Sequence, residues 1–155
     1  MGRSFKESRH PKRRINKPAL DPLTENHRTN VRVAIFDDSD AVIQAYTKRL
    51  NGSVTVVTKE PVECVQTAVE IFKIEQPDVV VTDLSLTVGH TEGFDILRAI
   101  RDISPATPVA LSTAAWCEQS TDELVQAIRR AHFDSVFQKA DLHTLRRFVY
   151  RSPRP

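Results

Sequence analysis

The strongest constraint on the fold is a set of short runs in which three or more apolar residues follow one another. They are VRVAIF at residues 31–36, DVVVTD at 78–83 and PVALST at 108–113. A strand with one wet face alternates apolar and polar residues, whereas a strand buried on both faces shows no such alternation. These runs therefore predict central strands of a sheet that is covered on both faces.

Amphipathic stretches alternate with these runs and with two further ones, SVTVVT at 53–58 and DSVFQK at 134–139. We expect the first helix to stop at Asn51-Gly52 and the second to begin near Pro61. The second helix has an apolar stripe made by Val62, Val65, Val69 and Phe72. Further helices are expected over 92–103, around 124–131 and over 141–149. Five βα units predict an α/β protein with a doubly wound, five-stranded parallel sheet, (βα)5.

The charge is unevenly distributed along the chain, because residues 1–29 carry eight Lys and Arg against three acidic residues. This segment has few apolar residues to offset the entropy of ordering it. We expect a basic, disordered arm over 1–29, one domain over 30–150, a short tail over 151–155 and no output domain.

No apolar run approaches the ~20 residues of a membrane span, and the N-terminus lacks the apolar core of a secretory signal. We therefore expect a cytoplasmic protein that does not associate with membranes. The basic arm has a single aromatic residue, Phe5, and no repeated interleaving of aromatic and basic residues, so direct nucleic-acid binding is not predicted.

Polar residues follow the predicted strands where each one ends. Asp37 and Asp38 follow the first strand, Asp83 the third, Thr113 ends the fourth and Lys139 the fifth. Ligands of such sheets bind outside the carboxyl ends of the strands. We therefore expect these five side chains to converge at one edge of the sheet.

Three converging carboxylates repel one another unless a cation lies among them or one of them takes up a proton. An oxygen-rich site without Cys or His favours a hard cation, Mg²⁺ before Zn²⁺. Beside the metal and Lys139, Asp83 would be ionised and able to accept a phosphoryl group. Mg²⁺, Lys139 and the Thr113 hydroxyl would share the developing charge.

Four motifs carry a resemblance to a known family: FDDSD at 36–40, VVVTDLSL at 79–86, PVALSTAA at 108–115 and SVFQKAD at 135–141. Over residues 30–150 the chain resembles the receiver domain of bacterial two-component response regulators. The resemblance implies a flavodoxin-like fold with strand order 2-1-3-4-5. It also implies a protein that is not an enzyme and shows at most slow autodephosphorylation.

The resemblance assigns roles to individual residues. Asp38 would bind Mg²⁺ directly, Asp37 largely through water, and the backbone carbonyl of Ser85 would complete the metal shell. Asp83 would receive its phosphoryl group from the phosphohistidine of a sensor histidine kinase or phosphotransfer protein, with Lys139 and Thr113 beside it. The signal would leave through a homodimer or an effector protein.

The expected output face consists of the fourth helix, the fifth strand and the fifth helix, and includes Val136, Phe137, Arg146 and Arg147. Val136 stands where the family commonly has an aromatic residue. We therefore expect the response to run mainly through Thr113 and the loop that holds Trp116.

Two other departures from the family pattern lie beside the site. Thr87 replaces a proline that commonly follows the acceptor strand, in a loop about two residues longer than usual. Ala140 follows the lysine where a proline, often cis, is typical. This replacement allows a trans or distorted turn and a displaced Lys139, because a cis bond before a residue other than proline costs about 2.5–4 kcal/mol.

Two alternative functions remain open from the sequence. A haloacid-dehalogenase-type, Mg-dependent phosphatase is similar in its D-x-D-x-V pattern, present here as Asp38, Asp40 and Val42. Members of that family have a second acidic pair after the lysine, whereas here only Asp141 follows. The phosphatase alternative would also leave Asp83 without a role. The other alternative is a receiver-like scaffold that works without phosphorylation.

Overall fold

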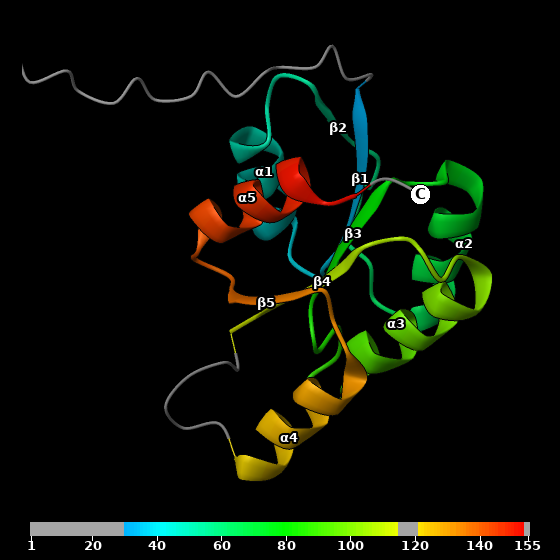
Figure 1. Ribbon diagram of the computed structural model, residues 1–155, viewed down its shortest axis with the longest axis vertical. Coiled ribbons are helices and arrows are strands. Elements are labelled where there is room, and N and C mark those ends of the chain that lie inside the picture. Colours follow the sequence, from blue (N-terminus) through cyan, green and yellow to red (C-terminus); the bar gives the residue numbers. More distant parts are fainter. Residues whose placement is uncertain (1–29, 115–120, 154–155) are drawn as a thin grey trace, which may run out of the picture.

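The computed structural model describes residues 30–114 and 121–153. Strands and helices alternate along the chain without exception in this part (Figure 1). The elements are β1 (Val31–Phe36), α1 (Asp40–Arg49), β2 (Val54–Val56), α2 (Val65–Glu75), β3 (Val79–Thr82), α3 (Glu92–Ile103), β4 (Val109–Thr113), α4 (Asp122–Ala131), β5 (Ser135–Gln138) and α5 (Leu142–Arg151).

The five strands form one parallel sheet in the order β2-β1-β3-β4-β5, which confirms the predicted topology. In Figure 1, α1 and α5 lie on one side of the sheet, and α2 and α3 lie on the other. α4 packs on the same side as α3, because its buried Ile128 contacts Leu84 and Leu111. The sheet is thus covered on both faces, as the apolar strands require.

β1 shows how a central strand serves two cores at once. Val33 and Ile35 pack into the core under α1 and α5. Ala34 and Phe36 point the other way, into the core under α2 and α3. Since successive side chains of a strand point to opposite faces, all these positions must be apolar.

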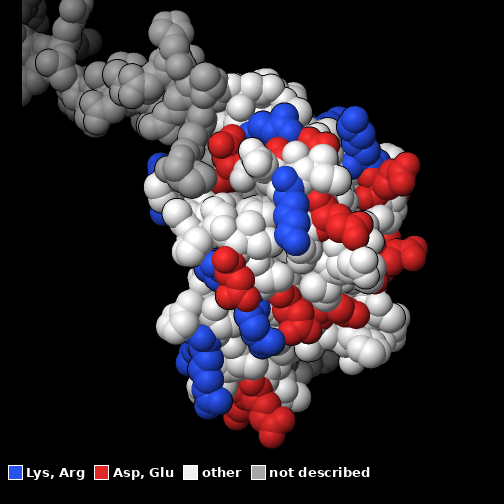
Figure 2. All heavy atoms as spheres, turned by 90° about the vertical axis from the view of Figure 1, so that its right-hand side faces the viewer, with Lys and Arg blue, Asp and Glu red and all other residues white. Residues whose placement is uncertain are grey.

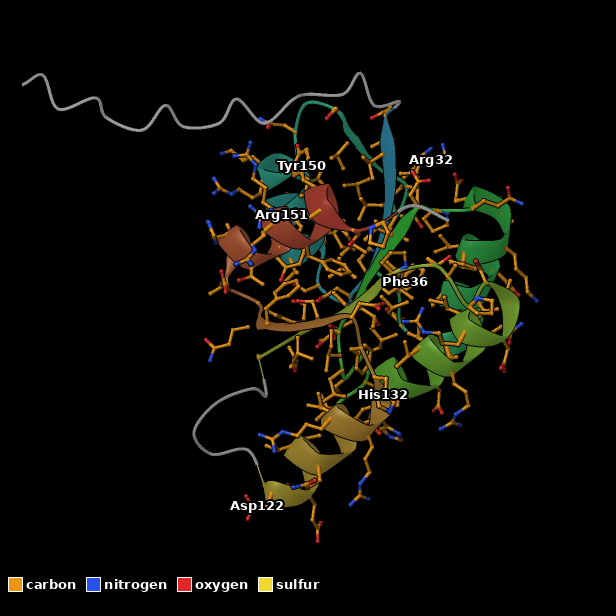
Figure 3. All side chains as sticks on the ribbon, viewed as in Figure 1. Arg32, Phe36, Asp122, His132, Tyr150 and Arg151 are labelled. Carbon is orange, nitrogen blue, oxygen red and sulfur yellow. The ribbon has the colours of Figure 1, made fainter. Side chains whose placement is uncertain are left out.

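Two helix ends agree with the sequence pattern. α1 ends at Arg49, and Gly52 follows with a φ of 99°, a left-handed conformation that favours glycine. α3 spans Glu92–Ile103, the range expected. At the far end of the fold, α4 begins at Asp122 and is closed by His132, both labelled in Figure 3.

The predicted start of α2 near Pro61 is wrong, since the helix begins at Val65. Val62 is fully buried, but it lies in the segment before the helix. Its amide donates to the carbonyl of Asp37 at 2.9 Å. This hydrogen bond ties the segment before the helix to the residue that follows β1.

The strands at the sheet edges are shorter than expected, because β2 covers only Val54–Val56 and β5 only Ser135–Gln138. Arg32 in β1 forms an ion pair of 2.6 Å with Glu75 at the end of α2, near the top of the sheet in Figure 3. The predicted arm over 1–29 lies outside the described residues. No helix in the described part of the chain is long and apolar enough to cross a membrane.

Candidate functional site

The end of β1 supplies two acidic residues with different surroundings. Asp37 is buried at 2% exposure, whereas Asp38 is exposed. Asp37 Oδ1 accepts a hydrogen bond from the Ser39 amide at 2.9 Å, just before α1 begins. The turn between β1 and α1 therefore fixes the buried carboxylate and leaves its neighbour at the surface.

The end of β3 supplies Asp83 beside this pair. Its amide donates to the Phe36 carbonyl at 2.8 Å, so the backbone of Asp83 continues the pairing of β3 with β1. Its Oδ1 accepts from the Leu84 amide at 2.7 Å. Asp83 is buried, with its carboxylate held by the Leu84 amide and its own amide bonded to the end of β1.

Lys139 joins the two buried carboxylates. It directly follows β5, and its ammonium lies 2.8 Å from Asp37 Oδ2 and 2.7 Å from Asp83 Oδ2. No cis peptide bond occurs in the described residues, so the turn into Ala140 is trans. In this trans turn, Lys139 still reaches both carboxylates.

The protonation of this group follows from burial and charge. Burial raises the pKa of Asp83 above its ordinary value, although the hydrogen bond and charge of Lys139 act in the opposite direction. Burial alone would lower the pKa of Lys139, but hydrogen bonds from Asp37 and Asp83 and their charges outweigh it and raise that pKa. The single ammonium of Lys139 therefore neutralises only part of the negative charge of the two carboxylates.

The donor set fits a hard divalent cation. Asp37, Asp38 and Asp83 each offer a carboxylate oxygen, and these atoms lie within 4.8 Å of one another. Oxygen ligands from carboxylates, completed by water, suit Mg²⁺. The under-compensated charge of the buried carboxylates is a second reason why a cation would be stabilised here.

Asp40 does not belong to this group. It lies exposed in the first turn of α1, where its carboxylate accepts from Gln44 one turn later at 2.5 Å. The D-x-D pattern of the phosphatase alternative therefore has one member in the carboxylate cluster and one in a local helix contact.

β4 ends at Thr113, which is buried. The preceding residue, Ser112, forms a hydrogen bond of 2.5 Å between its hydroxyl and that of Tyr46 in α1. Tyr46 also donates to the backbone carbonyl of Lys139 at 3.0 Å. Tyr46 was not among the residues predicted from the sequence, because it reads simply as an apolar position on the buried face of α1.

The loop from β3 to α3 is organised by its own polar groups. The Ser85 hydroxyl donates to the Thr87 carbonyl at 2.6 Å, and the Leu86 amide donates to Glu92 at 3.1 Å. Val88 stands at the tip with 97% exposure. The Ser85 side chain is thus turned into the loop, and a metal-binding role for its carbonyl stays a prediction.

The two residues of β5 that were expected on the output face, Val136 and Phe137, differ in their burial. Phe137 is 3% exposed and packs in the core under α1 and α5, so its predicted place on that face is wrong. Val136 is half-buried and packs against Leu84, Leu111 and Ile128. Trp116 lies outside the described residues.

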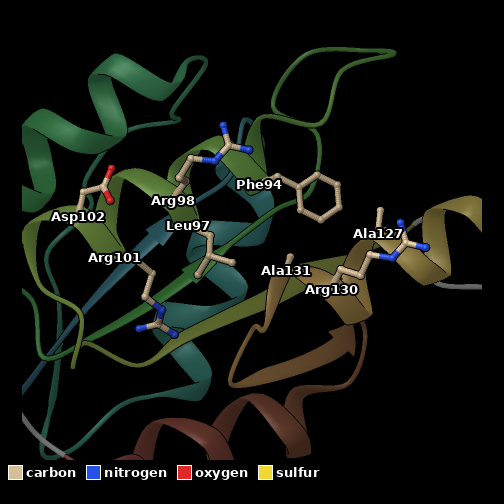
Figure 4. Close-up of a pocket in the computed structure, with 8 residues that line it drawn as sticks. All are labelled: Phe94, Leu97, Arg98, Arg101, Asp102, Ala127, Arg130 and Ala131. Atoms are coloured by element: carbon tan, nitrogen blue, oxygen red, sulfur yellow. The ribbon is translucent and has the colours of Figure 1, made fainter.

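A hollow lies between α3 and α4, away from the carboxylates (Figure 4). It has a volume of about 480 Å³, with an apolar floor and charged rims. Its lining consists of Phe94, Leu97, Arg98, Arg101, Asp102, Ala127, Arg130 and Ala131. Basic and acidic side chains are intermixed on the face shown in Figure 2, which has no large patch of one sign.

Comparison with known proteins agrees with this geometry. A family model of the response regulator receiver domain matches residues 33–149. No curated protein sequence matches the chain significantly.

Solved structures share the fold at low identity. The receiver domain of NarL from Mycobacterium tuberculosis superposes with a TM-score of 0.64 at 23% identity, over 79% of this chain and 95% of that one. A LuxR-family response regulator from Aurantimonas gives 0.63 at 20%, over 79% and 84%. The RcsB receiver domain from Salmonella enterica, solved with a beryllofluoride phosphomimetic, gives 0.63 at 18%, over 82% and 93%.

These findings give no support to the phosphatase alternative. The family match covers every strand except the first two residues of β1, and it spans both buried carboxylates and the lysine between them. The chain belongs to the family of response regulator receiver domains.

Proposed function

We propose that this receiver domain accepts a phosphoryl group on Asp83 from the phosphohistidine of a sensor histidine kinase or phosphotransfer protein. An Asp83 carboxylate oxygen attacks phosphorus, the O–P bond forms as the N–P bond breaks, and the histidine leaves as neutral imidazole after taking up a proton. The observation that carries the proposal is the ammonium of Lys139 between Asp37 and Asp83, at 2.8 and 2.7 Å.

The chain's own residues support this role in three ways. Backbone hydrogen bonds from Leu84 and to Phe36 hold Asp83 in place. Lys139 offers a fixed positive charge for the phosphoryl oxygens. Thr113 ends the neighbouring strand, where its hydroxyl would bind a phosphoryl oxygen.

Mg²⁺ would be held by Asp37, Asp38 and Asp83, with the Ser85 carbonyl as a further ligand. Bound there, it supplies positive charge to the carboxylates and the transferring phosphoryl group. Asp38 is exposed, so it can bind a cation that arrives from solvent. Asp37 and Asp83 are prepared for the same cation by the excess negative charge described above.

Receiver domains are phosphoacceptors and are generally not enzymes, and we propose slow autodephosphorylation at most. The side chain of Asp83 is only 7% exposed, so water has little access to a phosphoryl group attached there. The signal would pass to a homodimer or effector through the surface of α4, β5 and α5. Arg146 and Arg147 are exposed on that surface, in α5.

Intact-mass measurement after incubation with acetyl phosphate and Mg²⁺ tests the proposal. Wild type should gain the mass of one phosphoryl group, and Asp83→Asn should gain none. Asp95→Asn is the matched control, because it removes an exposed carboxylate on α3 that contacts only Arg98 among the ion pairs of the described residues. Equal labelling of wild type and Asp83→Asn would exclude Asp83 as the acceptor. A wild type without labelling would favour the scaffold alternative.

A further inference from the structure

Tyr46 places a polar group in the core beneath the site. The residue is 2% exposed, and its ring packs in the cluster between the sheet, α1 and α5. Its hydroxyl oxygen lies 2.5 Å from Ser112 Oγ and 3.0 Å from the Lys139 carbonyl oxygen. A buried hydroxyl is costly unless it is hydrogen-bonded, so both contacts matter for the stability of this arrangement.

The direction of the two hydrogen bonds follows from the atoms. A carbonyl oxygen can only accept, so Tyr46 donates its single proton to Lys139. Ser112 must then donate to the Tyr46 oxygen. Burial raises the pKa of Tyr46 above its ordinary value, which keeps the phenol protonated and able to donate.

This chain of hydroxyls joins three segments that supply the candidate site. Tyr46 belongs to α1, which begins at Asp40, one residue beyond the acidic pair and Ser39. Ser112 precedes Thr113 in β4, and Lys139 follows β5. The Tyr46 side chain therefore connects the backbone of Lys139 to α1 and β4.

We propose that Tyr46 is a positioning residue for phosphoryl transfer, which fixes the Lys139 carbonyl and thereby the place of its ammonium. The inference rests on the function proposed above. Lys139 is held at both ends: its carbonyl accepts from Tyr46, and its ammonium binds Asp37 and Asp83. Without the hydrogen bond from Tyr46, the Lys139 backbone can shift. The ammonium is then positioned by the two carboxylates alone and lies away from the place where it would bind a phosphoryl group.

Tyr46→Phe tests the proposal, because it keeps the ring and removes the hydroxyl. The control is Tyr150→Phe, which changes the only other tyrosine of the chain. Tyr150 lies on α5 (Figure 3) and donates to the Asn51 carbonyl at 3.2 Å, on the exposed side of the fold. Each variant loses a phenol that donates to a backbone carbonyl, but only Tyr46 contacts the lysine.

One rate, one half-maximal Mg²⁺ concentration and one spectrum are compared. We expect Tyr46→Phe to slow acetyl phosphate labelling about fivefold, the effect of losing one hydrogen bond. The Mg²⁺ concentration for half-maximal labelling should change by less than about twofold, since the three carboxylates keep their backbone supports. Tyr150→Phe should match wild type in both. In the metal-free, unphosphorylated protein, the ¹³Cε signal of Lys139 should move in Tyr46→Phe alone.

Replacement of Tyr46 by 4-aminophenylalanine provides a rescue, because it keeps a donor at the same end of the ring. Its labelling rate should return to within about twofold of wild type. This variant also tests the proposal if Tyr46→Phe does not fold. Labelling as slow as that of Tyr46→Phe would refute the proposal, because a restored donor at this position would then not restore the rate.

The proposal is overturned if Tyr46→Phe labels at the wild-type rate, or if its rate and Mg²⁺ dependence are lost together, which would indicate general damage to the site. Failure of the phosphoacceptor proposal is seen separately, as a wild type that does not label. In that case the Lys139 signal still decides the positioning role: a shift in Tyr46→Phe supports it, and an unmoved signal refutes it.

Discussion

Gly93 is the residue whose replacement should disturb Asp83 most directly without touching its side chain. It lies in the first turn of α3, and its amide donates to the Leu84 carbonyl at 2.9 Å. A Cβ at this position would be 2.4 Å from the Asp83 carbonyl oxygen and 2.9 Å from Leu84 Cα. Both neighbours are backbone atoms, so neither can move aside by a change of rotamer.

The expected cost of Gly93→Ala combines two opposing effects. Overpacking of this kind costs up to ~3 kcal/mol, while alanine gains ~1 kcal/mol over glycine in a helix. The net loss in free energy of unfolding is then about 2 kcal/mol, which lowers the melting temperature by about 8 °C. The Asp83 carbonyl must also recede by about 0.6 Å to reach the 3.0 Å that real contacts respect.

Such a displacement should slow acetyl phosphate labelling about tenfold, since a misplacement of ~1 Å can cost ~100-fold in a reaction that depends on alignment. Gly52→Ala is the matched control. It strains a φ of 99° at a cost of ~1–2 kcal/mol but meets no atom within 4 Å and lies away from the carboxylates. We expect Gly52→Ala to melt earlier and label normally. The reasoning is refuted if Gly93→Ala matches wild type in both measurements, or if the two variants slow labelling equally.

Three further predictions concern the carboxylates and the end of β4. Asp38→Ala should abolish the rise in melting temperature that Mg²⁺ gives wild type, and should raise the metal-free melting temperature, because one repelling charge is gone; a retained Mg²⁺ response contradicts the metal site. Burial raises the pKa of Asp83 above its ordinary 3.8, so folded protein holds a proton that unfolded chain releases, and stability falls as pH rises through that window. Urea unfolding from pH ~4 to pH ~7 should therefore show metal-free Asp83→Asn gaining stability relative to wild type; a constant difference argues against a raised pKa. Thr113→Ala should retain labelling but lose any change in sedimentation caused by beryllofluoride; an unchanged response would remove Thr113 from the output.

The sheet and the convergence of its acidic residues could be predicted because both follow from short-range patterns. An apolar run such as that of β3 predicts a strand with no solvent-exposed face. Parallel strands also bring their carboxyl ends to the same edge of the sheet. Asp37 and Asp83 therefore had to lie close together once their strands were placed side by side. The same rule brought Lys139 to this edge, since β5 joins the same sheet.

The remaining features depend on contacts between distant segments. Val62 fits the helical stripe of α2 in sequence, but it lies before the helix, where its amide donates to the distant Asp37 carbonyl. Phe137 follows Val136 in an edge strand, and only the packing of α1 and α5 shows that it is covered. Tyr46 looks like any large side chain on a buried helix face, because its partners lie 66 and 93 residues further along the chain.

The amide of Asp83 donates to the Phe36 carbonyl, which makes the proposed acceptor part of the hydrogen-bonded ladder between the two central strands. Backbone in such a ladder opens only with the sheet, so its amide should exchange with solvent deuterium as slowly as the core. The loop from Ser85 to Thr91 is mostly exposed and is joined to the body by few bonds, so its amides should exchange orders of magnitude faster. The two kinds of backbone meet at Leu84. Backbone movement that makes room for a phosphoryl group would accordingly occur in the loop after Leu84. A change in the exchange rates of the loop amides would record it.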